Sequence, residues 1–283
     1  MARATGPRLR TIGLHAVNYG TLLLACAFVL FPLLWGLITS LKDPSSVTAY
    51  PPRWIPDPVT LDNYRVVIGK STMPTYFANS IVVSLSTVLL TLVLGVHAGY
   101  AAARFSFRFK NALLFYILST VMIPGIAILV PLYMIAIWAG LYDKLVVLVL
   151  IYAAWQVPTT TWVMRGFFAM LPRELEESAL IDGCSRLGAF YRIILPLAWP
   201  GLSAAAILTF IYAWNEFIIA LTLTLENANR LVPIGLYFYV SEFGIPWGQL
   251  TAAVMIAIVP PAVFFALLQK KFIQGLSSGA IKG

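Results

Sequence analysis

Residues that could do chemistry are scarce in this sequence. Glu216 is the one carboxylate within a long apolar stretch, and it has no His or Lys companion with which to share acid–base work. His15 and His97 stand alone, without the Cys, His or carboxylate neighbours of a metal site. Cys26 and Cys184 fall in different kinds of segment and are not expected to pair. The sequence also lacks the G-x-x-x-x-G-K-[ST] loop that cradles ATP phosphates, so no enzyme is predicted.

A polar segment between two apolar stretches holds the densest group of carboxylates. Pro172 suits the first turn of a helix, and three carboxylates within the next five residues favour its positive end. Gly183 is expected to end this helix, in a left-handed turn or at a close backbone contact. Residues 185–194 form a second, amphipathic helix, after which two prolines break the chain. Such a pair of helices either binds another protein or lies on a membrane surface without a partner.

The composition determines which elements position these residues. Of 283 residues, 60% are hydrophobic and 11% are charged, against about 45–50% and 25% in soluble globular domains. A helix needs about 20 apolar residues to cross a bilayer, so the chain has room for roughly five to seven crossings. A secreted enzyme, a cytosolic nucleotide-binding enzyme and a disordered tail are excluded. The apolar runs predict six spans, at about residues 18–41, 76–103, 112–138, 145–164, 200–222 and 247–268.

The positions of Lys and Arg predict the orientation of these spans. With the N-terminus in the cytoplasm, thirteen of the 19 basic residues fall on the cytoplasmic side, where basic residues are enriched. The net charge of +8 is therefore interpreted as topology and contact with anionic lipid, since no basic stripe with interleaved aromatics lies outside the spans. We expect an all-α polytopic membrane protein with cytoplasmic tails at 1–17 and 269–283, a six-helix domain at 18–268, and a cytoplasmic helix–turn–helix loop at 172–199.

The spacing inside this loop resembles a known motif. Glu177, Ala179, Gly183 and Ile193, followed by Leu195 and Pro196, match the EAA loop, E-A-A-x3-G-x9-I-x-L-P, of the membrane subunits of bacterial ABC importers. Ser178 replaces the first Ala of the motif, one small residue for another. Elsewhere the chain is similar to the carbohydrate-uptake, MalG-like branch of these permeases. The matching strings are TLDNY (60–64), NS (79–80), AGYAAAR (98–104), PLY (131–133), DG (182–183), WNEF (214–217) and the C-terminal GLSSGAIKG.

The resemblance implies a permease subunit that carries a sugar, such as a di- or oligosaccharide or a sugar derivative, across the cytoplasmic membrane. It implies three kinds of protein partner: a second, homologous permease, an ATPase dimer that binds ATP and Mg²⁺, and an extracytoplasmic binding protein that meets the outer loops. No cofactor is expected in this chain itself. The implied coupling residues, which contact the ATPase, are Glu174, Glu177, Ser178, Ala179, Asp182, Gly183, Ile193, Leu195 and Pro196. In the C-terminal tail, the implied contacts with the ATPase are Ser277, Ser278, Gly279 and Lys282.

Polar groups and helix breaks at membrane depth predict a path for the solute. A carboxylate that faces lipid costs about 2.5–3.5 kcal/mol, so Glu216 should face protein or water. Together with Asn79, Trp214 and Asn215, it supplies ring and amide groups of the kind that stack on and hydrogen-bond to sugars. Prolines at 124, 131, 158, 260 and 261 interrupt three spans, as helices that line a water-filled cavity often do. Ordinary kinks and helix packing explain the same residues without a substrate.

Two alternatives to a sugar importer follow from the same residues. The first is an importer of the same architecture for an amino acid, a peptide or an ion, because only the branch-specific strings favour a sugar. The second is a stand-alone channel or an intramembrane enzyme, which the isolation of Glu216 disfavours. Selectivity is expected to reside largely in the binding protein and the partner permease.

Overall fold

The computed structural model of the chain describes residues 6–51, 53–240 and 244–280. The regular elements in these ranges are helices, and an isolated antiparallel bridge joins Lys42 to Val59. The chain divides into two compact units, the first made of residues 1–71 and 239–256 and the second of residues 72–238 and 257–283.

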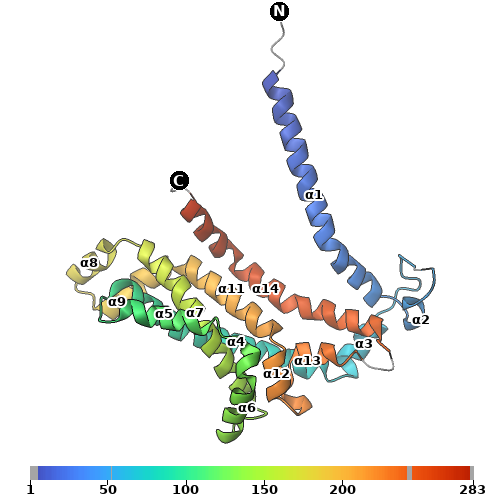
Figure 1. Cartoon of the computed structure of the whole chain (residues 1–283). Coiled ribbons are helices and arrows are strands. Elements are labelled where there is room, and N and C mark those ends of the chain that lie inside the picture. Colours follow the sequence, from blue (N-terminus) through green and yellow to red (C-terminus); the bar gives the residue numbers. More distant parts are fainter. Residues whose placement is uncertain (1–5, 52, 241–243, 281–283) are drawn as a thin grey trace, which may run out of the picture. The chain divides into compact units, whose positions relative to one another are not determined.

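The apolar runs form helices that are long enough to cross a membrane (Figure 1). Four helices within the described ranges reach this length alone, and the count rises to six if each of two sharply bent pairs is one span. The all-α fold with up to six spans is therefore confirmed. The four long helices are α1 (Gly6–Ser40), α4 (Met73–Arg104), α7 (Leu145–Met170) and α14 (Trp247–Ala280).

The second unit contains the polar loop and most of the apolar core. Its long helices α4 and α7 run parallel and pack closely at Gly95 and Gly99, which have the small-xxx-small spacing that lets membrane helices approach. A Cβ on Gly99 would lie only 3.0 Å from the Thr161 carbonyl oxygen. Its other elements are α5 (Lys110–Thr120), η1 (Gly125–Ile128), α6 (Leu129–Trp138), α8 (Glu174–Ile181), α9 (Arg186–Ala189), η2 (Phe190–Ile194), α10 (Leu195–Leu197), α11 (Trp199–Asn215), α12 (Ile218–Leu223), η3 (Asn227–Asn229) and α13 (Val232–Tyr237).

Two clusters of buried side chains hold this unit together. One surrounds Tyr152 and joins α4, α7, α11, α12 and α13. The other surrounds Phe168 and Phe190 and packs η2 against the C-terminal parts of α4 and α7. The second cluster fixes the polar loop to the long helices.

The third and fifth predicted spans are interrupted. The sequence predicted a candidate break in the third span, at Pro124, but none in the fifth. The third span bends by 89° between α5 and η1, at Pro124. The fifth is shorter than predicted as a continuous helix, because α11 ends at Asn215 and the chain restarts in α12. By contrast, Pro158 and the Pro260–Pro261 pair lie inside continuous helices. Pro131 likewise lies inside a helix, within residues 129–138, so Pro124 is the predicted break that falls between helices, after α5 ends at Thr120.

In the first unit, the TLDNY string ties a loop to the end of α1. Asn63, at the start of α3 (Asp62–Gly69), is buried and donates from Nδ2 to the Ser40 and Lys42 carbonyls at 3.0 and 2.8 Å. The Tyr64 hydroxyl lies 2.7 Å from Ser40 Oγ. A Cβ on Gly248 of α14 would meet the Asn63 amide at 2.7 Å. The string therefore joins the start of α3 to the end of α1. The short helix α2 (Pro44–Val47) lies between these two helices in the sequence.

Candidate functional site

The polar loop folds as the helix–turn–helix that the sequence predicts. Its first helix is α8 (Glu174–Ile181), and Gly183 follows it with a φ of +86°. The Cys184 N–H donates to the Ala179 carbonyl at 2.9 Å and the Gly183 N–H to the Leu180 carbonyl at 3.1 Å, which is a Schellman ending. No described atom outside the neighbouring residues lies within 4 Å of a Cβ built on Gly183. Glycine is therefore needed here for the left-handed turn, not for a close contact within the chain.

The second helix of the loop begins at a side-chain cap and contains an irregular turn. Ser185 Oγ accepts the Gly188 N–H at 3.1 Å, which starts α9. Residues 190–194 then form the π-helical turn η2, just before Pro196, whose nitrogen cannot donate. This helix meets α11 at a bend of 74°.

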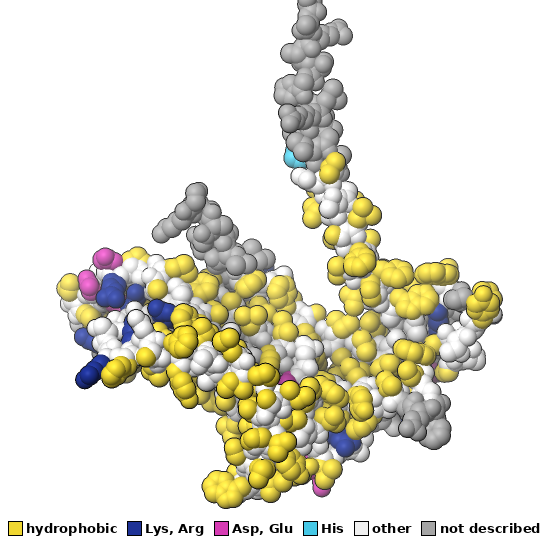
Figure 2. All heavy atoms as spheres, viewed as in Figure 1, with side chains coloured by type: hydrophobic (Ala, Val, Ile, Leu, Met, Phe, Trp, Pro, Cys, Tyr) yellow, Lys and Arg dark blue, Asp and Glu magenta, His cyan; other side chains and the backbone are white. Residues whose placement is uncertain are grey.

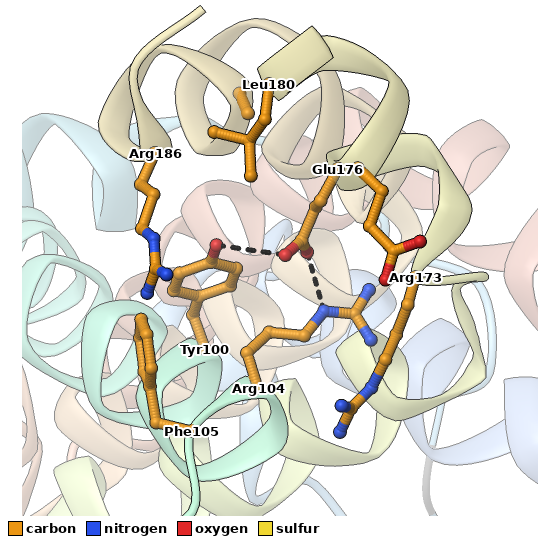
Figure 3. A pocket seen from close by; sticks show the side chains of 9 residues that line it. Tyr100, Arg104, Phe105, Arg173, Glu176, Leu180 and Arg186 are labelled. Carbon is orange, nitrogen blue, oxygen red and sulfur yellow. Dashed lines mark hydrogen bonds and ion pairs between the residues drawn. The ribbon is translucent and has the colours of Figure 1, made fainter.

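A buried ion pair attaches the first helix of the loop to the end of α4. Arg104 Nε donates to Glu176 Oε1 at 2.6 Å, and the two side chains are only 6% and 16% exposed (Figure 3). Arg104 Nη2 also donates to the Leu171 carbonyl at 3.1 Å, and the Tyr100 hydroxyl donates to Glu176 Oε2 at 3.3 Å. The Tyr100 ring packs on Phe190 with centroids 4.4 Å apart. One turn of α4 thus holds both helices of the loop.

A polar cavity of about 220 Å³ opens beside this ion pair. Figure 3 shows Arg104 and Glu176 joined at its centre, with Arg173 and Arg186 on either side. In the space-filling view, Lys and Arg side chains gather around α8 and α9, whereas hydrophobic side chains cover most of the visible surface of the long helices (Figure 2).

The predicted coupling residues divide into an exposed group and a packed group. Glu174, Glu177, Ser178, Asp182 and Gly183 are exposed, as is Pro196 at the end of the loop. Ile193 and Leu195 are partly buried and pack against the Phe190 cluster. Ala179 is only 3% exposed, on a helix that packs against α9 and η2, so its small side chain serves packing inside this chain.

Two residues of the site were missed by the sequence analysis. Glu176 was expected only to favour the helix N-terminus, yet it makes the buried ion pair. Ile181 is 86% exposed at the end of α8, beside the exposed carboxylates, although it is strongly apolar. The sequence did contain a signal for the exposure of Ile181. It directly precedes Asp182 and Gly183, which mark the end of a helix, and side chains at helix ends are often exposed.

Asn79, which is predicted to line a solute path, attaches a loop to α4. Its Nδ2 donates to the Ala228 and Arg230 carbonyls at 2.7 and 2.9 Å. Its neighbour Ser80 accepts the Val232 N–H at 2.9 Å. The NS string therefore holds the segment between η3 and α13 by its backbone.

The WNE trio lies at the break between α11 and α12. Trp214 is buried and stacks on Phe210, with centroids 5.7 Å apart, so its ring face is already occupied. Asn215 is exposed. Glu216 is half-buried and accepts the Ile219 and Ala220 N–H groups at 2.9 and 3.0 Å and the Tyr152 hydroxyl at 2.7 Å. Glu216 therefore faces protein, one of the two environments expected for it, and the burial and stacking of Trp214 favour the packing alternative for that residue.

The predicted contacts in the C-terminal tail fall at the edge of the structure. Residues Ser277, Ser278 and Gly279 belong to the last turns of α14. Lys282 lies outside the described residues.

Comparisons with known proteins agree with this architecture. Residues 92–278 match the family model described as "Binding-protein-dependent transport system inner membrane component". A sulfoquinovosyl glycerol transport system permease of Agrobacterium fabrum is 36% identical over 254 residues, which are 90% of this chain and 89% of that protein. A trehalose transport system permease of Mycobacterium tuberculosis is 36% identical over 276 residues, which are 96% of this chain and all of that protein.

A solved structure shows the same fold. A chain of a bacterial ABC transporter for import of the acidic polysaccharide alginate superposes with a TM-score of 0.78 at 20% identity, covering 96% of this chain and 100% of that one. The apolar helices, the helix–turn–helix and the family match together describe a multi-pass membrane protein. The chain belongs to the family of binding-protein-dependent transport system inner membrane components.

Proposed function

We propose that this chain is the permease subunit of an ATP-driven importer that carries a sugar, such as a di- or oligosaccharide or a sugar derivative, into the cell. Family membership supports the importer, and two similar permeases named for a sulfoquinovosyl glycerol and a trehalose system support a sugar. Uptake of a panel of labelled sugars in a deletion strain tests the substrate class. Loss of amino acid or peptide uptake, with sugar uptake intact, would contradict it.

Coupling to ATP is the task we assign to α8. Its exposed face offers Glu177 for a polar contact and Ile181 for an apolar one, and both fit the docking of a separate ATPase subunit. ATP and Mg²⁺ would bind to that ATPase dimer and not to this chain. The observation that carries the proposal is the buried Arg104–Glu176 ion pair, because it makes α8 mechanically continuous with α4. Movement of α8 would therefore move α4 and the helices packed on it.

The remaining partners and the orientation follow from the same scheme. Both termini and α8 would lie in the cytoplasm, which fits the excess of Lys and Arg on that side. A second, homologous permease would complete the pathway, and an extracytoplasmic binding protein would deliver the sugar to the outer loops. Of the predicted path residues, the exposed Asn215 is the one we assign to contact with solute, because Asn79, Trp214 and Glu216 are engaged within the chain.

Co-purification of the ATPase with a double variant tests the coupling surface. Glu177→Arg with Ile181→Ser should weaken the contact about tenfold or more, because burial of an Ile side chain contributes about 1.5–3 kcal/mol. Glu226→Arg is a matched control, since Glu226 is exposed on the loop between α12 and η3, far along the chain from α8. Equal recovery of the ATPase with the double variant, the control and the unmodified chain would contradict the assignment. Failure to recover any ATPase with the unmodified chain in mild detergent would refute the importer itself.

A further inference from the structure

The turn between α4 and α5 corrects the expectation that no basic stripe with interleaved aromatics lies outside the spans, because residues 105–110 interleave aromatic and basic side chains on the surface. Phe105, Phe107 and Phe109 are all exposed, Phe109 to 70%. Lys110 Nζ donates to the Phe105 carbonyl at 3.0 Å, and the Arg108 guanidinium lies 4.9 Å from the centroid of the Phe109 ring. Exposed phenylalanines at the end of a membrane helix, with basic side chains among them, are typical of a segment that enters the boundary between headgroups and acyl chains.

The polar cavity beside α8 is continuous with this turn. Phe105 lines the cavity, and the Arg186 guanidinium lies 5.9 Å from the centroid of its ring. Three arginines line the cavity against two glutamates, Glu176 and Glu177, which leaves one net positive charge. The ion pair with Glu176 neutralises Arg104. Arg173 and Arg186 are exposed, and neither forms an ion pair with a carboxylate in the described part of the chain.

We propose that this cavity binds the phosphate of an anionic phospholipid headgroup. Arg173 and Arg186 would hold the phosphate oxygens, because a guanidinium presents paired donors that match phosphate geometry. The single net charge complements that of a phosphodiester. The exposed rings of Phe107 and Phe109 favour a lipid over a soluble phosphate, since they would lie among the acyl chains while the phosphate sits in the cavity.

This inference rests on the proposed function only in placing the α4–α5 turn at the cytoplasmic leaflet. It adds a role for the lipid that the coupling scheme lacks. The headgroup would occupy the cavity beside the Arg104–Glu176 ion pair, which holds α8 to α4. Anionic lipid would therefore stabilise the docked position of α8.

Native mass spectrometry of the full chain tests the site. The protein is released from detergent micelles that contain equal parts of phosphatidylcholine and phosphatidylglycerol, and the lipid that it retains is identified. Arg173→Gln with Arg186→Gln should weaken phosphatidylglycerol retention about tenfold for each arginine, as expected for charge-assisted hydrogen bonds. Arg165→Gln with Arg192→Gln is the matched control, because it removes the same charge from residues that do not line the cavity. Equal losses in both double variants would overturn the proposal.

A second comparison separates a lipid from a soluble phosphate. Phe107→Ser with Phe109→Ser should lower phosphatidylglycerol retention, and inorganic phosphate should not displace the lipid from the unmodified chain. Displacement by inorganic phosphate at the lipid's own concentration would overturn the lipid assignment. Co-purification of the ATPase with the same variants tests the proposed importer function separately. Failure of the lipid site can therefore be distinguished from failure of the proposed function.

Discussion

The Arg104→Gln substitution should release α8 from α4 while leaving the rest of the helices in place. The glutamine cannot replace the 2.6 Å ion pair, so the Glu176 carboxylate keeps only the 3.3 Å bond from the Tyr100 hydroxyl. The Leu171 carbonyl loses its guanidinium donor as well. Removal of one partner from a buried ion pair costs about 3–5 kcal/mol. Because the Glu176 side chain retains 16% exposure, we expect the low end, about 3 kcal/mol.

Hydrogen exchange followed by mass spectrometry measures this change locally. A loss of about 3 kcal/mol corresponds to roughly a hundredfold faster exchange of the α8 amides if they exchange through undocking of that helix. Peptides from α12 should be unaffected, since that helix packs around Tyr152 in the other cluster. Arg192→Gln removes an exposed cation of the same loop and should change nothing.

The double variant Arg104→Gln with Glu176→Gln makes the test sharper. Both charges are then absent, so no ion is left buried without its partner, and the loss should be smaller than the sum of the two single losses. Unchanged exchange of α8 in Arg104→Gln would refute the attachment of α8 through this ion pair. Equally faster exchange in α8 and α12 would show global destabilisation and would refute the local reasoning.

Two further predictions concern the packing of α4 against α7 and the cap of α12. Gly99→Ala places a Cβ 2.8 Å from Met164 Cβ and 3.0 Å from the Thr161 carbonyl oxygen, so overpacking should cost about 1–3 kcal/mol and lower the thermal midpoint in detergent. Gly166 of α7 is the control, because no described atom beyond its chain neighbours and helix backbone lies within 4 Å of a Cβ built on it, so Gly166→Ala should be neutral or stabilising by up to about 1 kcal/mol. Equal thermal midpoints for the two variants would contradict the close contact at Gly99. Glu216→Ala removes the acceptor of two N–H groups of α12 and should cost about 0.5–2 kcal/mol for the lost cap, with about 1–3 kcal/mol more for the Tyr152 hydroxyl left buried without its acceptor. Tyr152→Phe keeps the cap and should lower the thermal midpoint less than Glu216→Ala, and the reverse order would show that the cap does not hold α12.

Features encoded over a few residues could be predicted from the sequence. The apolar runs identified the membrane helices, because about 20 such residues are needed for each crossing. The end of α8 at Gly183 could also be predicted, since a glycine after a helical run marks a left-handed ending. Pro124 was one of several candidate breaks, and the Gly125 that follows it forms a Pro-Gly turn signal, which Pro158 lacks.

Features that depend on distant residues could not be predicted. Arg104 and Glu176 lie 72 positions apart, and the pattern of α8 alone makes Glu177 as good a candidate for the ion pair as Glu176. Asn79 reaches a loop about 150 positions away, so its amide looked free to meet a solute. The end of α11 was missed because the chain stays apolar on both sides of Glu216, and only the fold shows that this carboxylate caps a second helix.

Asn79 and Ser80 hold their loop by bonds that do not depend on the side chains of the residues to which they bind. All three of their bonds are to main-chain atoms, the carbonyls of Ala228 and Arg230 and the N–H of Val232. Main-chain groups are the same whichever side chain a residue carries. The side chains of Ala228 and Arg230 can therefore change without loss of these bonds, whereas Leu231 and Val232 are restricted by their burial in the core.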